Sequence, residues 1–169
     1  LIKKIGFLFK EMEERVNKGV KTYDLILSGF TGSYNSRESH LITTTERDRI
    51  EELIKELEIS TIINKEFDYL SDGQKRIVLL ARAIVYKPKF IVLDEPFSNL
   101  DIKSNYFLFK ILNKLMDQSI NIIYITHSLD SILPRTNRVI LLKNGKIIND
   151  GTPANIINSE NISKLYDAP

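Results

Sequence analysis

The hydrophobic positions of the chain form two patterns, continuous runs and stripes with helical spacing. The runs Ile5–Phe9, Phe90–Leu93 and Asn121–Ile125 predict strands, the last two buried on both faces of a parallel sheet. Residues 23–30 and the segment from Ser104 to Met116 carry apolar side chains on one side and predict helices. Because strands and helices alternate, we expect an α/β fold with right-handed crossovers.

The segment after the first helix has a different pattern. The polar stretch from Thr31 to Thr44 predicts a loop. Thr45 and Asp48 then have the spacing of a capping pair at a helix start. The helix that follows is expected to bury a stripe formed by Ile50, Leu53, Ile54 and Leu57.

A second capping pair, Ser71 and Gln74, precedes a predicted helix from Lys75 to about Tyr86. The insertion between the first two strands is therefore mostly helical. We expect residues 1–30 and 89–169 to form an α/β core and residues 31–88 to form a helical subdomain inserted into it.

The last part of the chain predicts a hairpin. Val139–Lys143 and Lys146–Ile148 flank Asn144-Gly145, a strong signal for a two-residue turn. Thr152-Pro153 then supplies an N-cap residue and a proline at the first helical position.

Composition limits the class of protein. The chain has 169 residues, 43% of them hydrophobic and 27% charged, which is typical of one globular domain. A net charge of +2 argues against a dedicated nucleic-acid surface, and no nucleic-acid partner is expected. The absence of cysteine excludes a disulfide scaffold and a thiolate zinc site. The first residue is Leu1 and no secretory leader follows it, so the sequence is interpreted as an internal segment of a longer protein.

Two adjacent carboxylates, Asp94 and Glu95, follow the strand Phe90–Leu93. Open α/β sheets bind ligands at the carboxyl ends of their strands, so these acids are candidates for Mg²⁺ binding and for activation of a water molecule. A pair of solvated acids at a strand end is the structural alternative. His127 follows the next strand, Asn121–Ile125, and is expected to project into the same crevice.

Four segments in this order resemble the motifs of the ATP-binding-cassette (ABC) ATPases. Leu70–Gln74, here called the signature segment, is similar to the family signature but has Asp72 in place of a glycine. Ile91–Pro96 resembles the Walker B strand, Ser98–Asp101 the D-loop and Thr126–Ser128 the switch-histidine loop. The resemblance covers essentially the whole chain. It implies a P-loop NTPase (RecA-like) parallel sheet core, incomplete here, with a helical signature subdomain inserted.

The resemblance also implies a role for each motif residue. Asp94 would hold Mg²⁺ through water, and Glu95 would be the general base for the water that attacks the γ-phosphate of ATP. His127 would contact that phosphate. In a head-to-tail dimer of ATPase subunits, the residues implied to bind the nucleotide of the other subunit, or to connect the two sites, are Ser71, Gly73, Gln74 and Asp101.

Two departures from the family pattern stand out. No Gly-x-x-x-x-Gly-Lys-Ser/Thr sequence is present, and the only Gly-Lys pair, Gly145-Lys146, lies in the predicted hairpin. We expect the phosphate-binding Walker A loop to lie before Leu1, which predicts that this chain alone is inactive. Lys10, followed by Glu11, occupies the position of the family's glutamine loop, so either Glu11 substitutes or the coupling differs.

The resemblance favours an ATPase subunit of an importer. Tyr23–Phe30 and the tail Glu160–Tyr166 are similar to importers of metals, siderophores or molybdate. The implied partners are transmembrane permease subunits, and the implied location is the cytoplasmic face of the cell membrane. Two alternatives remain: a soluble ABC ATPase of translation or DNA repair, and a cassette remnant that binds a partner without turnover.

Overall fold

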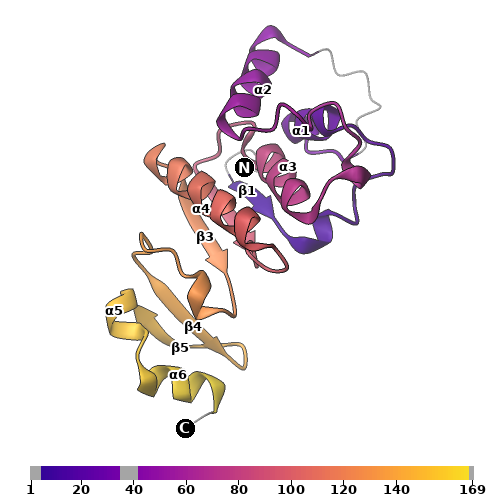
Figure 1. Ribbon diagram of the computed structural model, residues 1–169. Helices are drawn as coiled ribbons and strands as arrows, with labels where there is room; N and C mark the ends of the chain where they lie inside the picture. The colour runs from indigo at the N-terminus through magenta and orange to yellow at the C-terminus, as the bar shows by residue number, and fades with distance from the viewer. Residues whose placement is uncertain (1–4, 35–41, 168–169) are drawn as a thin grey trace. The chain divides into compact units, whose positions relative to one another are not determined.

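The chain is described by a computed structural model that covers residues 5–34 and 42–167 (Figure 1). These residues form two compact units, Leu1–Leu129 and Asp130–Pro169, and each is described by itself. The first unit is built on a parallel sheet with the order β1-β2-β3. Its strands are β1 (Ile5–Leu8), β2 (Phe90–Asp94) and β3 (Asn121–Ile125), which confirms the predicted strands and their parallel arrangement.

Four α-helices accompany this sheet in the described part of the first unit: α1 (Thr22–Thr31), α2 (Thr44–Glu56), α3 (Asp72–Ile84) and α4 (Ile102–Asp117). Short 3₁₀ helices lie at Lys10–Met12 and Phe67–Tyr69, and a third, Leu129–Ser131, lies where the units meet in sequence. The predicted helix at residues 23–30 is confirmed as α1. The division into an α/β core and a helical subdomain at residues 31–88 stays a prediction.

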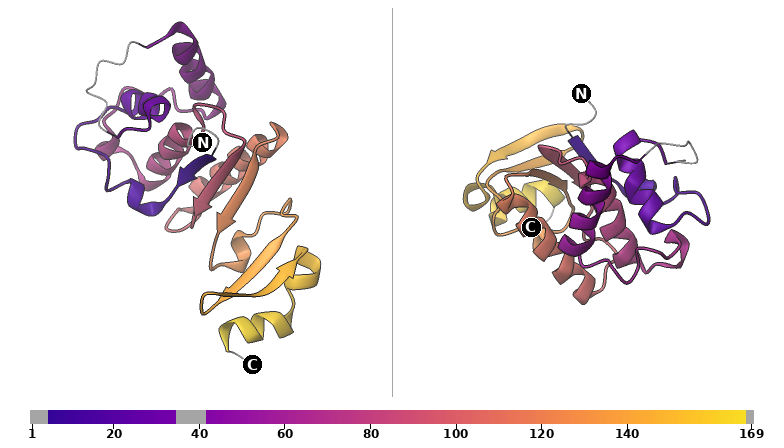
Figure 2. Two further views of the ribbon diagram at one scale, coloured as in Figure 1. Left: turned by 180° about the vertical axis from the view of Figure 1, so that it is seen from behind. Right: turned by 90° about the horizontal axis from the view of Figure 1, so that it is seen from above.

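Helices α3 and α4 cover one face of the sheet, as Figures 1 and 2 show from opposite sides. Leu8, Ile91 and Leu93 lie on this covered face and have no solvent exposure. Gly6 lies on the same face, where a Cβ atom would stand 2.5 Å from the carbonyl oxygen of Ala83 on α3. A side chain at this position would therefore separate α3 from β1.

Among the described residues of the first unit, no helix covers the other face of the sheet (Figure 2, left). Phe90, Ile123 and Ile125 are 42%, 55% and 51% exposed on it. The prediction that β2 and β3 are buried on both faces is therefore wrong for this structure. A continuous apolar run shows that both faces of a strand are apolar, but the described residues of the first unit place helices against one face only.

Helix α2 begins earlier than the predicted capping pair Thr45/Asp48 indicates. Its capping box is Thr43/Glu46, with the Glu46 N–H donating to Thr43 Oγ1 at 3.2 Å and the Thr43 N–H donating to Glu46 Oε2 at 3.0 Å. Glutamate reaches back to the cap N–H more easily than the shorter aspartate, which explains the shift of two residues. The predicted apolar stripe of this helix is confirmed as buried: Ile50, Leu53, Ile54 and Leu57.

The second unit contains the predicted hairpin. Strands β4 (Val139–Lys143) and β5 (Lys146–Gly151) pair antiparallel through Asn144 and Gly145, whose φ angles are 50° and 72°. Two positive φ angles are those of a type I′ turn, which asparagine and glycine tolerate best. Helices α5 (Pro153–Ile156) and α6 (Ser159–Tyr166) follow. Thr152 is the N-cap of α5 as predicted, although its side chain makes no capping hydrogen bond.

No helix among residues 5–34 and 42–167 combines the length and the apolar character that crossing a membrane requires.

Candidate active site

The backbone at Glu95 turns sharply as the chain leaves β2. Glu95 has a φ of 45°, in the left-handed region that costs a residue with a side chain about 1–2 kcal/mol. Three hydrogen bonds hold this conformation. The Glu95 N–H donates to the Ile125 carbonyl at 2.9 Å, and the Glu95 carbonyl accepts from the N–H and the hydroxyl of Ser98 at 3.1 Å and 2.9 Å. The strained residue is thereby fastened to the end of β3.

The Glu95 side chain meets the loop that follows β3. Its Oε1 accepts a hydrogen bond from the backbone N–H of His127 at 2.7 Å and lies 2.7 Å from His127 Nδ1. The Thr126 hydroxyl donates to Oε2 at 3.4 Å. Sequence reasoning predicted that Glu95 and His127 project into one crevice, and the structure brings them into direct contact across 32 residues of chain.

This pair is suited to proton transfer because it combines a partly shielded carboxylate with an accessible imidazole. The Glu95 side chain is 27% exposed and that of His127 is 81% exposed. A carboxylate held by a backbone N–H has a fixed direction, as a general base requires. The imidazole stands beside it at the solvent boundary, where a substrate could reach it.

Asp94, the last residue of β2, pairs in register with Ile125 on the uncovered face. Its carboxylate makes no hydrogen bond or ion pair with the described residues, and no group of three or more metal-ligating side chains gathers anywhere in residues 5–34 and 42–167. A single available carboxylate fits Mg²⁺, which keeps several waters and takes one or two protein carboxylates beside substrate phosphates. Asp94 therefore fits the predicted role of binding Mg²⁺ only together with a ligand that supplies further oxygen atoms to the ion.

The signature segment forms the start of α3. Ser71 and Gln74 make the predicted capping box: the Gln74 N–H donates to Ser71 Oγ at 3.3 Å, and the Ser71 N–H donates to Gln74 Oε1 at 3.1 Å. Asp72 is exposed in the first turn, while Gly73 is buried. The start of a helix presents N–H groups and a partial positive charge, so it favours an anionic ligand.

Asp101 closes the D-loop by capping α4. The Ser104 N–H donates to Asp101 Oδ1 at 2.9 Å, and the Ser104 hydroxyl donates to Oδ2 at 2.8 Å. These bonds from Ser104 hold the pKa of Asp101 below its usual value, because they favour the charged carboxylate. Asp101 is therefore a fixed negative charge at the beginning of α4.

Lys10 and Glu11 lie just beyond the carboxyl end of β1, in the 3₁₀ helix Lys10–Met12. The three strands are parallel, so this segment leaves the sheet at the same edge as Glu95 and His127. Both side chains are exposed. Whether Glu11 takes the place of the family's glutamine stays a prediction.

Sequence reasoning named Thr126 and Ser104 as parts of a loop and a helix but did not predict their contacts with the site residues. Thr126 donates to Glu95 and also accepts a hydrogen bond from the Ser128 N–H at 3.1 Å, which orders the loop around His127. No local pattern signals this bond, because it joins the ends of two strands. Ser104 could have been found, since it stands three residues after Asp101 in the spacing of a helix cap.

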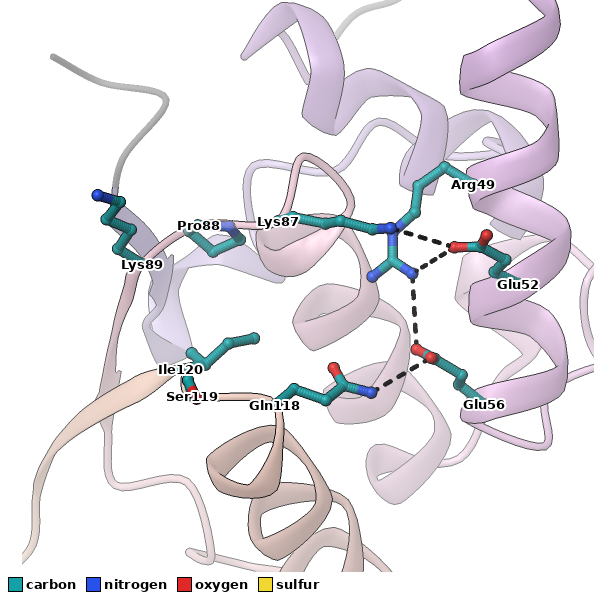
Figure 3. A pocket seen from close by; sticks show the side chains of 9 residues that line it. All are labelled: Arg49, Glu52, Glu56, Lys87, Pro88, Lys89, Gln118, Ser119 and Ile120. Carbon is teal, nitrogen blue, oxygen red and sulfur yellow. Dashed lines mark hydrogen bonds and ion pairs between the residues drawn. The ribbon is translucent and has the colours of Figure 1, made fainter.

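The opposite edge of the sheet carries an ionic cluster rather than a candidate site (Figure 3). There Arg49 Nε donates to the Val85 carbonyl at 3.2 Å, and Arg49 Nη1 lies 3.0 Å from Glu52 and 3.6 Å from Glu56. The cluster borders a cavity of about 390 Å³ lined by Arg49, Glu52, Glu56, Lys87, Pro88, Lys89, Gln118, Ser119 and Ile120. Lys89 and Ile120 precede β2 and β3, so this cavity lies at the amino ends of the strands.

A parallel α/β sheet with an acid–histidine pair where two strands end, and a signature-like helix start, is the arrangement that the resemblance to the ABC ATPases implies. The profile of the ABC transporter family matches residues 1–98. The chain therefore belongs to the ABC transporter family, and its α/β fold is of the P-loop NTPase class, as the resemblance implied.

Individual relatives agree with this assignment. An ABC transporter ATP-binding protein of Methanocaldococcus jannaschii is 34% identical over 95% of this chain and 57% of its own length. A solved metal-chelate type ABC transporter in an inward-facing conformation matches with a TM-score of 0.84 at 26% identity, over 98% of this chain and 64% of that chain. CbiO1 of Clostridium perfringens, part of the ABC transporter complex cbiONQ, matches with a TM-score of 0.76 at 25% identity, over 98% of this chain and 63% of that chain. The chain spans less than two thirds of the length of each of these proteins.

Proposed function

We propose that this chain supplies the general base and the signature segment of an ATPase subunit, and that the whole protein hydrolyses ATP to drive import through a membrane permease. The contact between Glu95 and His127 carries the proposal, with Glu95 Oε1 at 2.7 Å from both the backbone N and the ring Nδ1 of His127. The positive φ of Glu95, together with these two contacts where two strands end, supports a functional role for its carboxylate.

In the proposed mechanism Glu95 orients a water molecule and accepts its proton. The backbone N–H of His127 fixes the carboxylate, so that the base does not have to be positioned during the reaction. The imidazole of His127 then stabilises the negative charge that develops on the transferred phosphate. Asp94 would hold a hydrated Mg²⁺, which when bound neutralises charge on the phosphates of ATP.

The proposed assembly is a head-to-tail dimer in which Ser71, Gly73 and Gln74 face the nucleotide of the other subunit. The first-turn N–H groups of α3 and the partial positive charge of its N-terminus support this role. Asp72 adds a negative charge at the same place and is expected to weaken the attraction. We further propose transmembrane permease subunits as partners, a position at the cytoplasmic face of the membrane, and a metal-chelate type of cargo. The likeness to transporters of that type supports these proposals.

The test is to replace Glu95→Gln in the whole protein. The amide keeps the size of the side chain but cannot accept a proton, so single-turnover ATP hydrolysis should fall by about 10²–10⁴-fold while nucleotide binding survives. Glu51→Gln makes the same chemical change on the exposed side of α2 and should leave hydrolysis unchanged. Hydrolysis at the wild-type rate in the Glu95→Gln variant would show that the base lies elsewhere.

The 169-residue chain alone offers a second test. It contains no Walker A sequence, so we expect weak ATP affinity and no measurable phosphate release. Turnover of about 1 s⁻¹ or more by this chain, a normal enzyme rate, would contradict the proposed division of roles.

A further inference from the structure

The signature segment and the D-loop meet at one side chain, that of Ser104 on α4. A Cβ atom built on Gly73 would lie 2.3 Å from Ser104 Oγ and 2.7 Å from Ser104 Cβ. The backbone of Gly73 therefore rests directly against the Ser104 side chain. A glycine is required at this position of α3 as long as a serine occupies position 104.

The same Ser104 hydroxyl holds Asp101. It donates to Asp101 Oδ2 at 2.8 Å, while the Ser104 N–H donates to Oδ1 at 2.9 Å. One side chain of two heavy atoms thus contacts the buried glycine of the signature segment on one side and the last residue of the D-loop on the other. A displacement of Asp101 therefore acts on the same side chain against which the backbone of Gly73 packs.

We propose that Ser104 is a positioning residue that makes the signature segment and the D-loop move as one body. The proposal rests on the proposed function, in which Gly73 faces the nucleotide of the other subunit and Asp101 connects the two sites. In this proposal Ser104 acts through Gly73 and Asp101 and not by contacting the nucleotide. It keeps the first turn of α3 in register with the D-loop, so that closure at one site is transmitted to the other.

The contact can be tested by exchanging the sizes of its two residues in the whole protein. Gly73→Ala should lower ATP turnover by roughly 10²-fold, because a misplacement of about 1 Å at a reacting group costs that much. Ser104→Gly removes the two atoms that a Cβ at position 73 would meet. The double variant Gly73→Ala with Ser104→Gly should therefore recover activity by about 10-fold or more over Gly73→Ala alone.

A second measurement tests the contact between Ser104 and Gly73 without an activity assay. Ser104→Ala lies on α4, yet it should speed hydrogen exchange of the Gln74 and Lys75 amides, which bond to Ser71 at the start of α3. In the active protein it should raise KM more than it lowers kcat, because ATP-dependent closure becomes harder. Thr43→Ala removes a comparable hydroxyl cap from α2 and should change neither quantity.

The outcomes separate the two proposals. A double variant that loses as much activity as the two single changes multiplied together, or unchanged exchange at Gln74 and Lys75 in Ser104→Ala, overturns the role of Ser104. If the wild-type protein hydrolyses no ATP but Ser104→Ala still speeds that exchange, the proposed function fails and the mechanical link stands.

Discussion

The two faces of the β1–β3 sheet carry similar side chains in very different surroundings. On the covered face, Leu8, Ile91 and Leu93 have no exposure. On the uncovered face, Phe90 and Ile123 are about half exposed. The apolar character of a strand therefore does not show which of its side chains stabilise the fold. A side chain stabilises it by burial only where a second layer of the fold lies against its face of the sheet.

The candidate site lies at the carboxyl ends of β2 and β3. Its charged side chains do not belong to the apolar packing on either face of the sheet. Glu95 leaves β2 directly after Asp94, which is on the uncovered face, and turns towards His127. Burial of the covered face holds β2 in place, and the position at which β2 ends determines where the Glu95 carboxylate lies. The comparison of the two faces can be tested by substitutions on each.

The largest effect is expected from isoleucines on opposite faces. Ile91→Ala removes a fully buried side chain and should lower the free energy of unfolding by about 2–5 kcal/mol. Ile123→Ala makes the same change on the uncovered face and should cost about 0.5 kcal/mol or less in the 169-residue chain. Urea denaturation of both variants measures the difference. Equal losses would show that the uncovered face is buried in solution, and a larger Ile123→Ala loss in the whole protein than in the chain would reveal a covering segment there.

An intermediate effect is expected from two buried arginines of α3. Arg82 Nε donates to Ser28 Oγ at 3.0 Å, and its guanidinium lies 3.7 Å from the ring centre of Tyr34. In Arg76, by contrast, Nε and Nη1 are buried without a hydrogen-bond partner among the described residues. Arg82→Met should therefore cost about 2 kcal/mol, because hydrogen bonds to a charged group are lost.

Arg76→Met is the matched control for this comparison. Removing a buried guanidinium with unpaired atoms should leave the free energy of unfolding unchanged or raise it by about 1 kcal/mol. Thermal unfolding of the two variants side by side distinguishes them. A loss for Arg76→Met as large as that for Arg82→Met would mean that Arg76 has a polar partner in solution.

Much of the fold could be predicted from the sequence because local patterns encode it. The strands, the helix at residues 23–30, the Ser71/Gln74 capping box and the Asn144-Gly145 turn all follow from neighbouring residues. The exposed face of β3 could not be predicted, because exposure depends on which other elements pack there. The start of α2 was misplaced because two Thr and acid pairs overlap there, and the longer side chain of Glu46 makes Thr43/Glu46 the better capping box.

The site was predicted in outline for a different reason. The order and spacing of the motifs placed Glu95 and His127 directly after two strands. Because these strands are parallel, their carboxyl ends lie at the same edge of the sheet. The hydroxyl of Thr126 on Glu95 and the contact of Ser104 with Gly73 were not predicted. Each joins segments that are distant in sequence, so no local pattern contains it.

The smallest effect is expected from a hydrogen bond that holds the first residue of β1. The Tyr86 hydroxyl, just beyond α3, donates to the Ile5 carbonyl at 2.6 Å. Tyr86→Phe should lower the free energy of unfolding at pH 7 by about 1 kcal/mol, the usual net worth of such a bond. Burial raises the pKa of Tyr86 above its ordinary value of 10.0, and the positive charge of Arg82 nearby opposes this rise. The stabilisation is therefore fully present below about pH 10 and is lost as the pH rises through the higher pKa of the folded protein, because a phenolate cannot donate. Urea denaturation at pH 7 and at alkaline pH should show the wild type converging on Tyr86→Phe, and a difference that stays constant with pH would show that the hydroxyl does not act through this bond.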